Sequence, residues 1–166
     1  MEVMPTPRIA VLGLGNPVVS DDRVGLAVAA EILRLLEASP IENVSVVEST
    51  RGGFELIDLL AGFHHAVIID CLSLPDPVPG RVRELSLTNV SGSARLINAH
   101  EISIDTAFQL AAAMGIEMPK TVEIFAIEGL DTSTVSEEMT PAVAAAVSPL
   151  ARRIHSSLAR NIRPHS

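Results

Sequence analysis

The sequence predicts an α/β fold, a single-domain three-layer sandwich whose mostly parallel, twisted sheet of five or six strands carries helices on both faces. Short apolar runs alternate with longer segments of helical periodicity, as in βαβ units. The 166 residues are 48% apolar and only 2% aromatic, so we expect residues 1–166 to form one domain around an aliphatic core. Residues 81–87 alternate polar and apolar side chains, which predicts one antiparallel edge strand.

The first half of the chain predicts alternating strands and helices. The first strand is rich in Ile, Val and Leu and ends at Gly13 and Gly15, as expected for a buried strand before a tight turn. The first helix repeats apolar side chains at helical spacing and stops before Pro40. The predicted elements are a strand at 8–14, a helix at 22–38, a strand at 44–49, a helix at 54–61 and a strand at 66–70.

Prolines interrupt the regular patterns in the second half of the chain. Pro75, Pro77 and Pro79 predict an irregular loop at 75–80, because proline lacks a backbone donor and restricts the residue before it. Pro149 lies within the last predicted helix, and we expect it to bend that helix or divide it in two. The remaining predicted elements are the edge strand at 81–87, a helix at 103–114, a strand at 122–127 and a helix at 141–159.

The charge balance excludes several classes of partner. The chain has 20 acidic and 12 basic residues and a net charge of −8, which disfavours phosphate backbones and anionic membranes. It has no Trp or Tyr to stack on bases. We therefore expect no nucleic acid and no membrane among its partners. The single cysteine, Cys71, favours a reduced compartment, so we expect a cytoplasmic location.

Three potential metal ligands come from loops and strand ends that the fold should bring together. In an open α/β sheet, ligands bind at the carboxyl ends of the strands where the chain order reverses. With strand order 2-1-3, Asp22 leaves the first strand and Asp70 is the last residue of the third. His100 belongs to a later loop and could complete the site. Two carboxylates and one imidazole suit a divalent transition metal and leave coordination positions for water or substrate.

Each of these residues also has a purely structural interpretation. Asp21 and Asp22 could be first-turn acids that complement a helix dipole behind a Ser20 cap. His100 alone would more often be an ordinary loop histidine. Asp70 is harder to explain in this way, because burying an acid at the end of an apolar strand is costly unless it is paired or bound. We interpret Cys71 as a small apolar group that fills space.

The residues that carry these candidates resemble the endopeptidases that mature nickel-iron hydrogenases. Residues 11–25 are similar to that family's opening motif: an apolar strand, Gly-x-Gly-Asn, an apolar pair, two acidic residues and a glycine. The other similar segments are 48–56, 68–70, 99–102 and 139–143. This resemblance implies an enzyme that cuts a C-terminal extension from the hydrogenase large-subunit precursor, which would be its protein partner.

The resemblance also implies a role for each candidate residue. Asp22, Asp70 and His100 match the family's three metal-contacting positions and would form the catalytic site. The metal is normally nickel carried by the precursor, and other divalent metals would occupy the site in isolation. General-base help from Asp22 or Asp70, or Lewis-acid polarisation by the metal, would drive hydrolysis.

Three alternatives remain to be weighed. Residues 11–17 also resemble the opening of peptidyl-tRNA hydrolases, but that likeness ends at Val18, and the acidic balance opposes a tRNA substrate. A dinucleotide-binding role lacks the third glycine of the Gly-x-Gly-x-x-Gly pattern. A noncatalytic metal-dependent chaperone or binding module for the same precursor needs the same three residues, so the sequence leaves it open.

Overall fold

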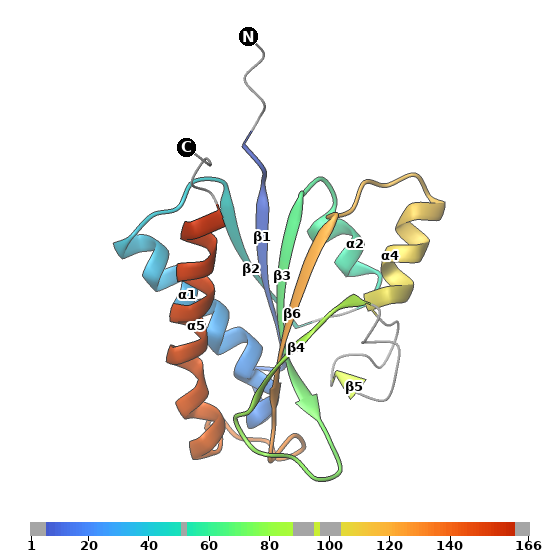
Figure 1. Cartoon of the computed structure of the whole chain (residues 1–166). Coiled ribbons are helices and arrows are strands. Elements are labelled where there is room, and N and C mark those ends of the chain that lie inside the picture. The colour runs from blue at the N-terminus through green and yellow to red at the C-terminus, as the bar shows by residue number, and fades with distance from the viewer. Residues whose placement is uncertain (1–5, 51–52, 88–94, 97–103, 162–166) are drawn as a thin grey trace.

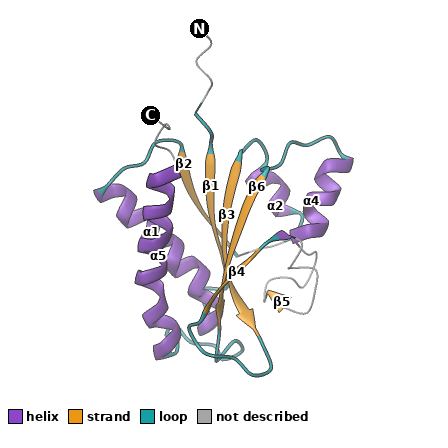
Figure 2. Cartoon of the chain, in the orientation of Figure 1, coloured by secondary structure: helices purple, strands orange, loops and turns teal. Residues whose placement is uncertain are grey.

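The computed structural model describes residues 6–50, 53–87, 95–96 and 104–161. Within them, a sheet has strand order β2-β1-β3-β6-β4, with β5 beside β3 (Figure 2). All neighbouring strands are parallel except β4 against β6 and β5 against β3. The strands are β1 Ile9–Leu14, β2 Val44–Ser49, β3 His65–Ser73, β4 Val82–Leu85, β5 Arg95–Leu96 and β6 Thr121–Glu128.

Helices cover both faces of this sheet, which confirms the predicted three-layer sandwich (Figure 1). Helices α1 (Val24–Ala38) and α5 (Pro141–Asn161) lie on one face, and α2 (Glu55–Leu60) and α4 (Ile104–Ala113) on the other. Alternate residues of β3 supply two aliphatic cores, with Val67 and Ile69 facing α1 and α5, and Ile68 and Leu72 facing the opposite layer. None of the described helices is both long and apolar enough to cross a bilayer.

Local sequence patterns predicted several elements correctly. Strand β2 has the predicted bounds, residues 75–80 form a loop, and β4 is the antiparallel edge strand. Two predictions need correction, because β3 continues through Ser73 and α5 is one continuous helix around Pro149. Strand β3 continues because β6 pairs with it as far as Leu72. Helix α5 is not divided because Pro149 faces solvent, while the next two residues are buried in the core.

Glycines let α1 lie directly on the first strand. A Cβ atom at Gly13 would lie 2.5 Å from the carbonyl oxygen of Gly25, and a Cβ at Gly25 would lie 2.1 Å from that of Leu14. Both distances are below any real contact, so only glycine permits this approach. A short 3-10 helix, η1 (Asp21–Arg23), leads into α1. The glycines of the motif therefore place η1 beside the carboxyl end of β1.

The edge strand β4 is held by a buried carboxylate. The Glu128 side chain is fully buried and pairs with the guanidinium groups of Arg81 and Arg83, the latter at 3.2 Å. It also accepts a hydrogen bond of 3.1 Å from the Val78 backbone N–H. The hydrogen bond from Arg81, aided by those from Val78 and Arg83, lowers the pKa of Glu128 from 4.5 to about 2 against the opposing effect of burial.

This ion pair predicts a stability loss in acid. A carboxylate with a depressed folded-state pKa stabilises the fold above its unfolded-state pKa and loses that contribution as the pH falls. We expect Glu128→Gln to lower the free energy of unfolding by about 1–3 kcal/mol near neutral pH. Its difference from the unsubstituted protein should shrink as the pH falls from 4.5 towards 2, as measured by urea titration.

The matched control is Glu84→Gln on the same strand. Glu84 pairs with Arg153, and both side chains are more than half exposed, so we expect a loss of less than about 1 kcal/mol. A Glu128→Gln effect that matched the Glu84→Gln effect, or did not change with pH, would contradict this account of β4.

Candidate functional site

Asp22 and Asp70 converge at the carboxyl end of β1, where the chain order reverses between β1 and β3. Gly13 of β1 pairs with Ile69, so Asp70 is level with Leu14, the last residue of β1. A Cβ at Gly25 would lie 2.5 Å from the Ile69 carbonyl oxygen. The start of α1, with η1 before it, therefore packs against β3 next to Asp70. The relative exposures are 5% for Asp22 and 1% for Asp70. Two buried carboxyl groups, both close enough to Cys71 to raise the pKa of its thiol, therefore lie at this end of β1.

The sequence suggested that Asp70 is the last residue of its strand, but it is not. Strand β3 continues three residues further and pairs with β6 on one side and β5 on the other. β1 ends level with Asp70, whereas β3 continues beyond it. Its Oδ1 atom accepts a 2.8 Å hydrogen bond from the Cys71 backbone N–H.

His100 lies outside the described residues. Among the residues that are described, no group of three or more His, Cys, Asp or Glu side chains is arranged to hold a metal ion. The structure thus brings together two of the three predicted residues, and the metal site formed by Asp22, Asp70 and His100 stays a prediction.

Asp21 has a different role from its neighbour Asp22. Its fully buried carboxylate accepts hydrogen bonds from the backbone N–H groups of Leu130, Asp131 and Thr140, all at 2.8–2.9 Å. The Thr140 hydroxyl donates to the same carboxylate at 2.8 Å. Asp21 therefore fastens η1 to the segment between β6 and α5.

The interpretation of this acidic pair as the first turn of a helix behind Ser20 is correct in position, because Ser20 is the N-cap residue of η1 and both acids lie in its first turn, but it is wrong about the cap. Ser20 makes no capping hydrogen bond. Its hydroxyl donates instead to the Glu138 carbonyl oxygen at 2.9 Å. Sequence reasoning missed the Asp21 contacts because they join residues more than 100 positions apart. The one available signal was that residues 11–25 and 139–143 both belong to family-like motifs.

Residues 16–21 and 129–140, which we call the loop pair, are joined along their length. Ser20 donates its backbone N–H to Thr134 at 3.0 Å, Ser136 donates to Val18 at 3.0 Å, and Val19 bridges Val135. Within the second loop, the Asp131 carboxylate accepts backbone hydrogen bonds from Ser133 and Thr134. Hydrogen bonds from Thr134 and Ser133 lower the pKa of Asp131. The two segments of the loop pair are thus held together by hydrogen bonds directly before Asp22 in the chain.

Asn16 shapes the first of these loops. Its Oδ1 atom accepts a 3.1 Å hydrogen bond from the Val18 backbone N–H, which is the local turn that short amide side chains favour.

Cys71 packs as an apolar residue beside the carboxylates. It has no exposed surface and belongs to the core between the sheet and helices α1 and α5. Burial, followed by the negative charges of Asp70, Asp22 and Asp21, raises the pKa of its thiol far above its ordinary value. A protonated, buried thiol is a poor nucleophile, so the chemistry available at this end of the sheet belongs to the carboxylates.

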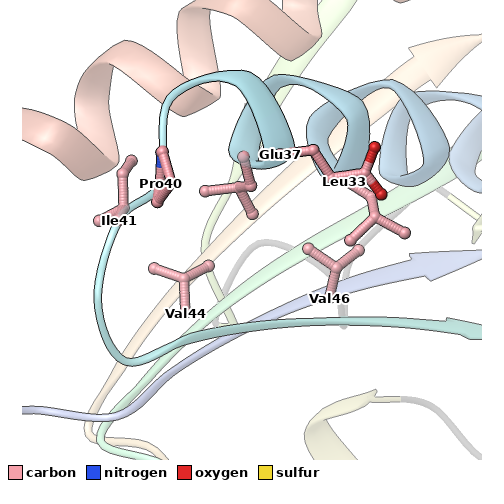
Figure 3. A pocket seen from close by; sticks show the side chains of 7 residues that line it. Leu33, Glu37, Pro40, Ile41, Val44 and Val46 are labelled. Carbon is pink, nitrogen blue, oxygen red and sulfur yellow. The ribbon is translucent and has the colours of Figure 1, made fainter.

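These carboxylates can support two kinds of chemistry. Carboxylate oxygens bind divalent cations, and a carboxylate near a water molecule can accept its proton. By contrast, the apolar groove between α1 and β2 contains Glu37 as its one ionisable side chain, beside Leu33, Val44 and Val46 (Figure 3). It lies at the amino end of β2, far along the sheet from Asp22, and lacks groups for catalysis.

The role of Asp21 predicts a large loss of stability on its neutralisation. We expect Asp21→Asn to lower the free energy of unfolding by about 2–4 kcal/mol, because an amide cannot accept from all the buried donors at once. The control is Asp131→Asn, which keeps an acceptor for its own turn and should cost less than about 1 kcal/mol. Equal urea midpoints for the two variants would show that Asp21 does not fasten the loops.

The burial of Cys71 predicts protection from alkylation. In the native protein at about pH 8, iodoacetamide should leave the thiol unmodified, because only the exposed thiolate reacts quickly. Denaturation in urea should expose it to complete modification, as followed by intact mass. Native labelling at the rate of a free thiol would contradict the placement of Cys71.

Comparisons with known proteins agree with this architecture. A family model described as hydrogenase maturation protease matches residues 28–157. No curated protein sequence gave a match. Similar solved structures include the hydrogenase maturating endopeptidase HybD from E. coli, with 22% identity, a TM-score of 0.74 and 93% of each chain covered. The [NiFe] hydrogenase maturation protease HybD from Thermococcus kodakarensis is 24% identical, with a TM-score of 0.65 over 92% of this chain and 99% of that one.

At these identities the solved structures establish the shared fold, and the family model, which spans most of the chain, establishes the relationship. The resemblance first seen in short motifs is confirmed. The chain belongs to the hydrogenase maturation protease family.

Proposed function

We propose that this protein is an endopeptidase that removes the C-terminal extension of a nickel-iron hydrogenase large-subunit precursor after nickel has been inserted. Family membership supports the general activity. The observation that carries the proposal is the pair of buried carboxyl groups, Asp22 and Asp70, at the carboxyl end of β1. This is the position at which open α/β sheets bind ligands.

In this proposal the nickel is part of the substrate. Oxygen atoms of Asp22 and Asp70, with an imidazole nitrogen of His100, suit a divalent transition metal. Their contact with the precursor's nickel would signal that insertion is complete and would bring the scissile bond to these residues. Other divalent metals would occupy the same residues in the isolated protein.

Hydrolysis needs an activated water and a proton for the leaving amine. Asp22 or Asp70 would accept a proton from the water as it attacks the peptide carbonyl, and that proton would pass to the amine nitrogen as the peptide bond breaks. The nickel of the substrate supplies Lewis-acid polarisation. The raised pKa of Cys71 supports attack by water over attack by a thiolate.

The test is trimming of nickel-loaded and nickel-free precursor from the same source, followed by intact mass. We expect only the loaded precursor to be shortened. Asp22→Asn, Asp70→Asn and His100→Ala should each lower the trimming rate by about 100-fold or more, the usual effect of losing general acid-base catalysis. The control is Asp58→Asn, because Asp58 is exposed on α2.

The other results are equally informative. Nickel-dependent complex formation without trimming would replace the proposal with a noncatalytic binding module for the precursor. Trimming of both precursors would contradict recognition of the metal. If the protein neither bound nor trimmed either precursor, the proposed substrate would be wrong.

A further inference from the structure

Exposed apolar side chains are concentrated at the end of the sheet that carries the candidate site. Of the seven large apolar residues that are exposed in the described part of the chain, five follow the carboxyl end of a strand. These are Val18 after β1, Phe54 after β2, Val78 after β3, and Leu130 and Val135 after β6. The other two, Leu33 and Met114, lie on α1 and after α4.

Four of the five lie on segments that hydrogen bonds join to one another or to the end of β6, and we call these four the apolar rim: Val18, Val78, Leu130 and Val135. Val18 and Val135 belong to the loop pair, whose two segments form an isolated antiparallel bridge between Val19 and Val135. Leu130 donates its N–H to Asp21, and Val78 donates its N–H to Glu128, directly before the second loop. The loops after β1, β3 and β6 gather at one end of the sheet (Figure 1).

The exposure of the rim is not the result of loose loops. The exposed fractions are 54% for Val18, 51% for Val78, 60% for Leu130 and 79% for Val135. Yet the backbone of Leu130 is bound by the buried carboxylate of Asp21 and that of Val78 by Glu128, while Val18 and Val135 lie on the two bridged loops. Single exposed apolar residues are ordinary, but a fixed cluster beside a site marks an interaction surface. Because the surface is already ordered, a partner would bind it with little entropic cost.

We propose that the apolar rim is the surface on which the folded body of the protein substrate docks while its tail reaches Asp22 and Asp70. This inference rests on the proposed function. The rim begins four residues before Asp22 in the chain and is tied to η1 through Asp21. A protein whose tail reaches Asp22 would therefore lie close to the rim.

The charges around the rim define the matching surface further. Residues 129–140 contain Asp131, Glu137 and Glu138 and no Lys or Arg. Of the cations near the rim, Arg81 is already paired with Glu128, and Arg23 donates to the Pro17 carbonyl oxygen beside Val18. The complementary surface is thus an apolar patch bordered by basic residues, because opposite charges steer the encounter and apolar contacts hold the complex.

The test separates docking from chemistry. A triple variant, Val18→Ser, Leu130→Ser and Val135→Ser, should raise the KM for trimming of the nickel-loaded precursor by about tenfold or more, as expected when interface anchors are lost. The kcat should stay within about twofold, because the carboxylates are unchanged. The control is the double variant Leu33→Ser and Met114→Ser, which removes exposed apolar groups elsewhere and should change neither constant.

Sedimentation of the precursor complex gives a second readout, with native protection of Cys71 from iodoacetamide as the check that the triple variant is folded. We expect weaker binding of the precursor by the folded triple variant. The docking proposal would be overturned if the triple variant kept its KM and its binding, or if the control variant lost as much. The proposed function would still stand in that case, provided that the unsubstituted protein trims the precursor. Dimerisation of the chain through the rim would also overturn it. If the unsubstituted protein bound the precursor through the rim but did not trim it, the docking proposal would be supported and only the catalytic role would be contradicted.

Discussion

The close approach of α1 to the ends of β1 and β3 is the constraint on which the site depends. A side chain at Gly25 would overlap the carbonyl oxygens of Leu14 and Ile69, so the helix begins directly above the junction of the two strands. That placement brings η1 over the end of β1, Asp22 beside Asp70, and Asp21 within reach of the loop after β6. The glycines of Gly-x-Gly-Asn and of Asp-Asp-x-x-Gly therefore allow the close packing that positions the two acids between them.

Four buried acids, Asp21, Asp22, Asp70 and Glu128, lie at this end of the sheet. Glu128 and Asp21 are neutralised by this chain, the first by guanidinium groups and the second by backbone donors and a hydroxyl. They hold the edge strand and the loop pair. Asp22 and Asp70 are also buried, and their negative charges help to raise the pKa of the Cys71 thiol. Several buried negative charges close together make a site suited to a cation. This fits the proposed recognition of a metal carried by a substrate.

The features that sequence could predict are those set by neighbouring residues. The aliphatic run of β2, the three prolines of the loop at 75–80 and the alternation in β4 each carry their own signal, and all were correct. The bounds of β3 and the continuity of α5 were not, because partner strands and core packing override the local pattern. The same limit explains the site. Asp22 and Asp70 could be placed by the rules of α/β topology, whereas the contacts of Asp21 required knowledge of which distant loop would lie against it.

Recognition and chemistry share one rigid unit in this arrangement. The bonds from Asp21 to Leu130 and Thr140 place an apolar rim residue and the start of α5 relative to Asp22, the residue next to Asp21. A substrate body held on the rim would present its tail to the carboxylates at a fixed distance, with no loop to order first. Positioning of this kind can supply a large part of a rate enhancement, because reacting groups lose their translational freedom on binding and not in the transition state. A single buried carboxylate would in this way connect the surface that selects a partner to the residues that act on it.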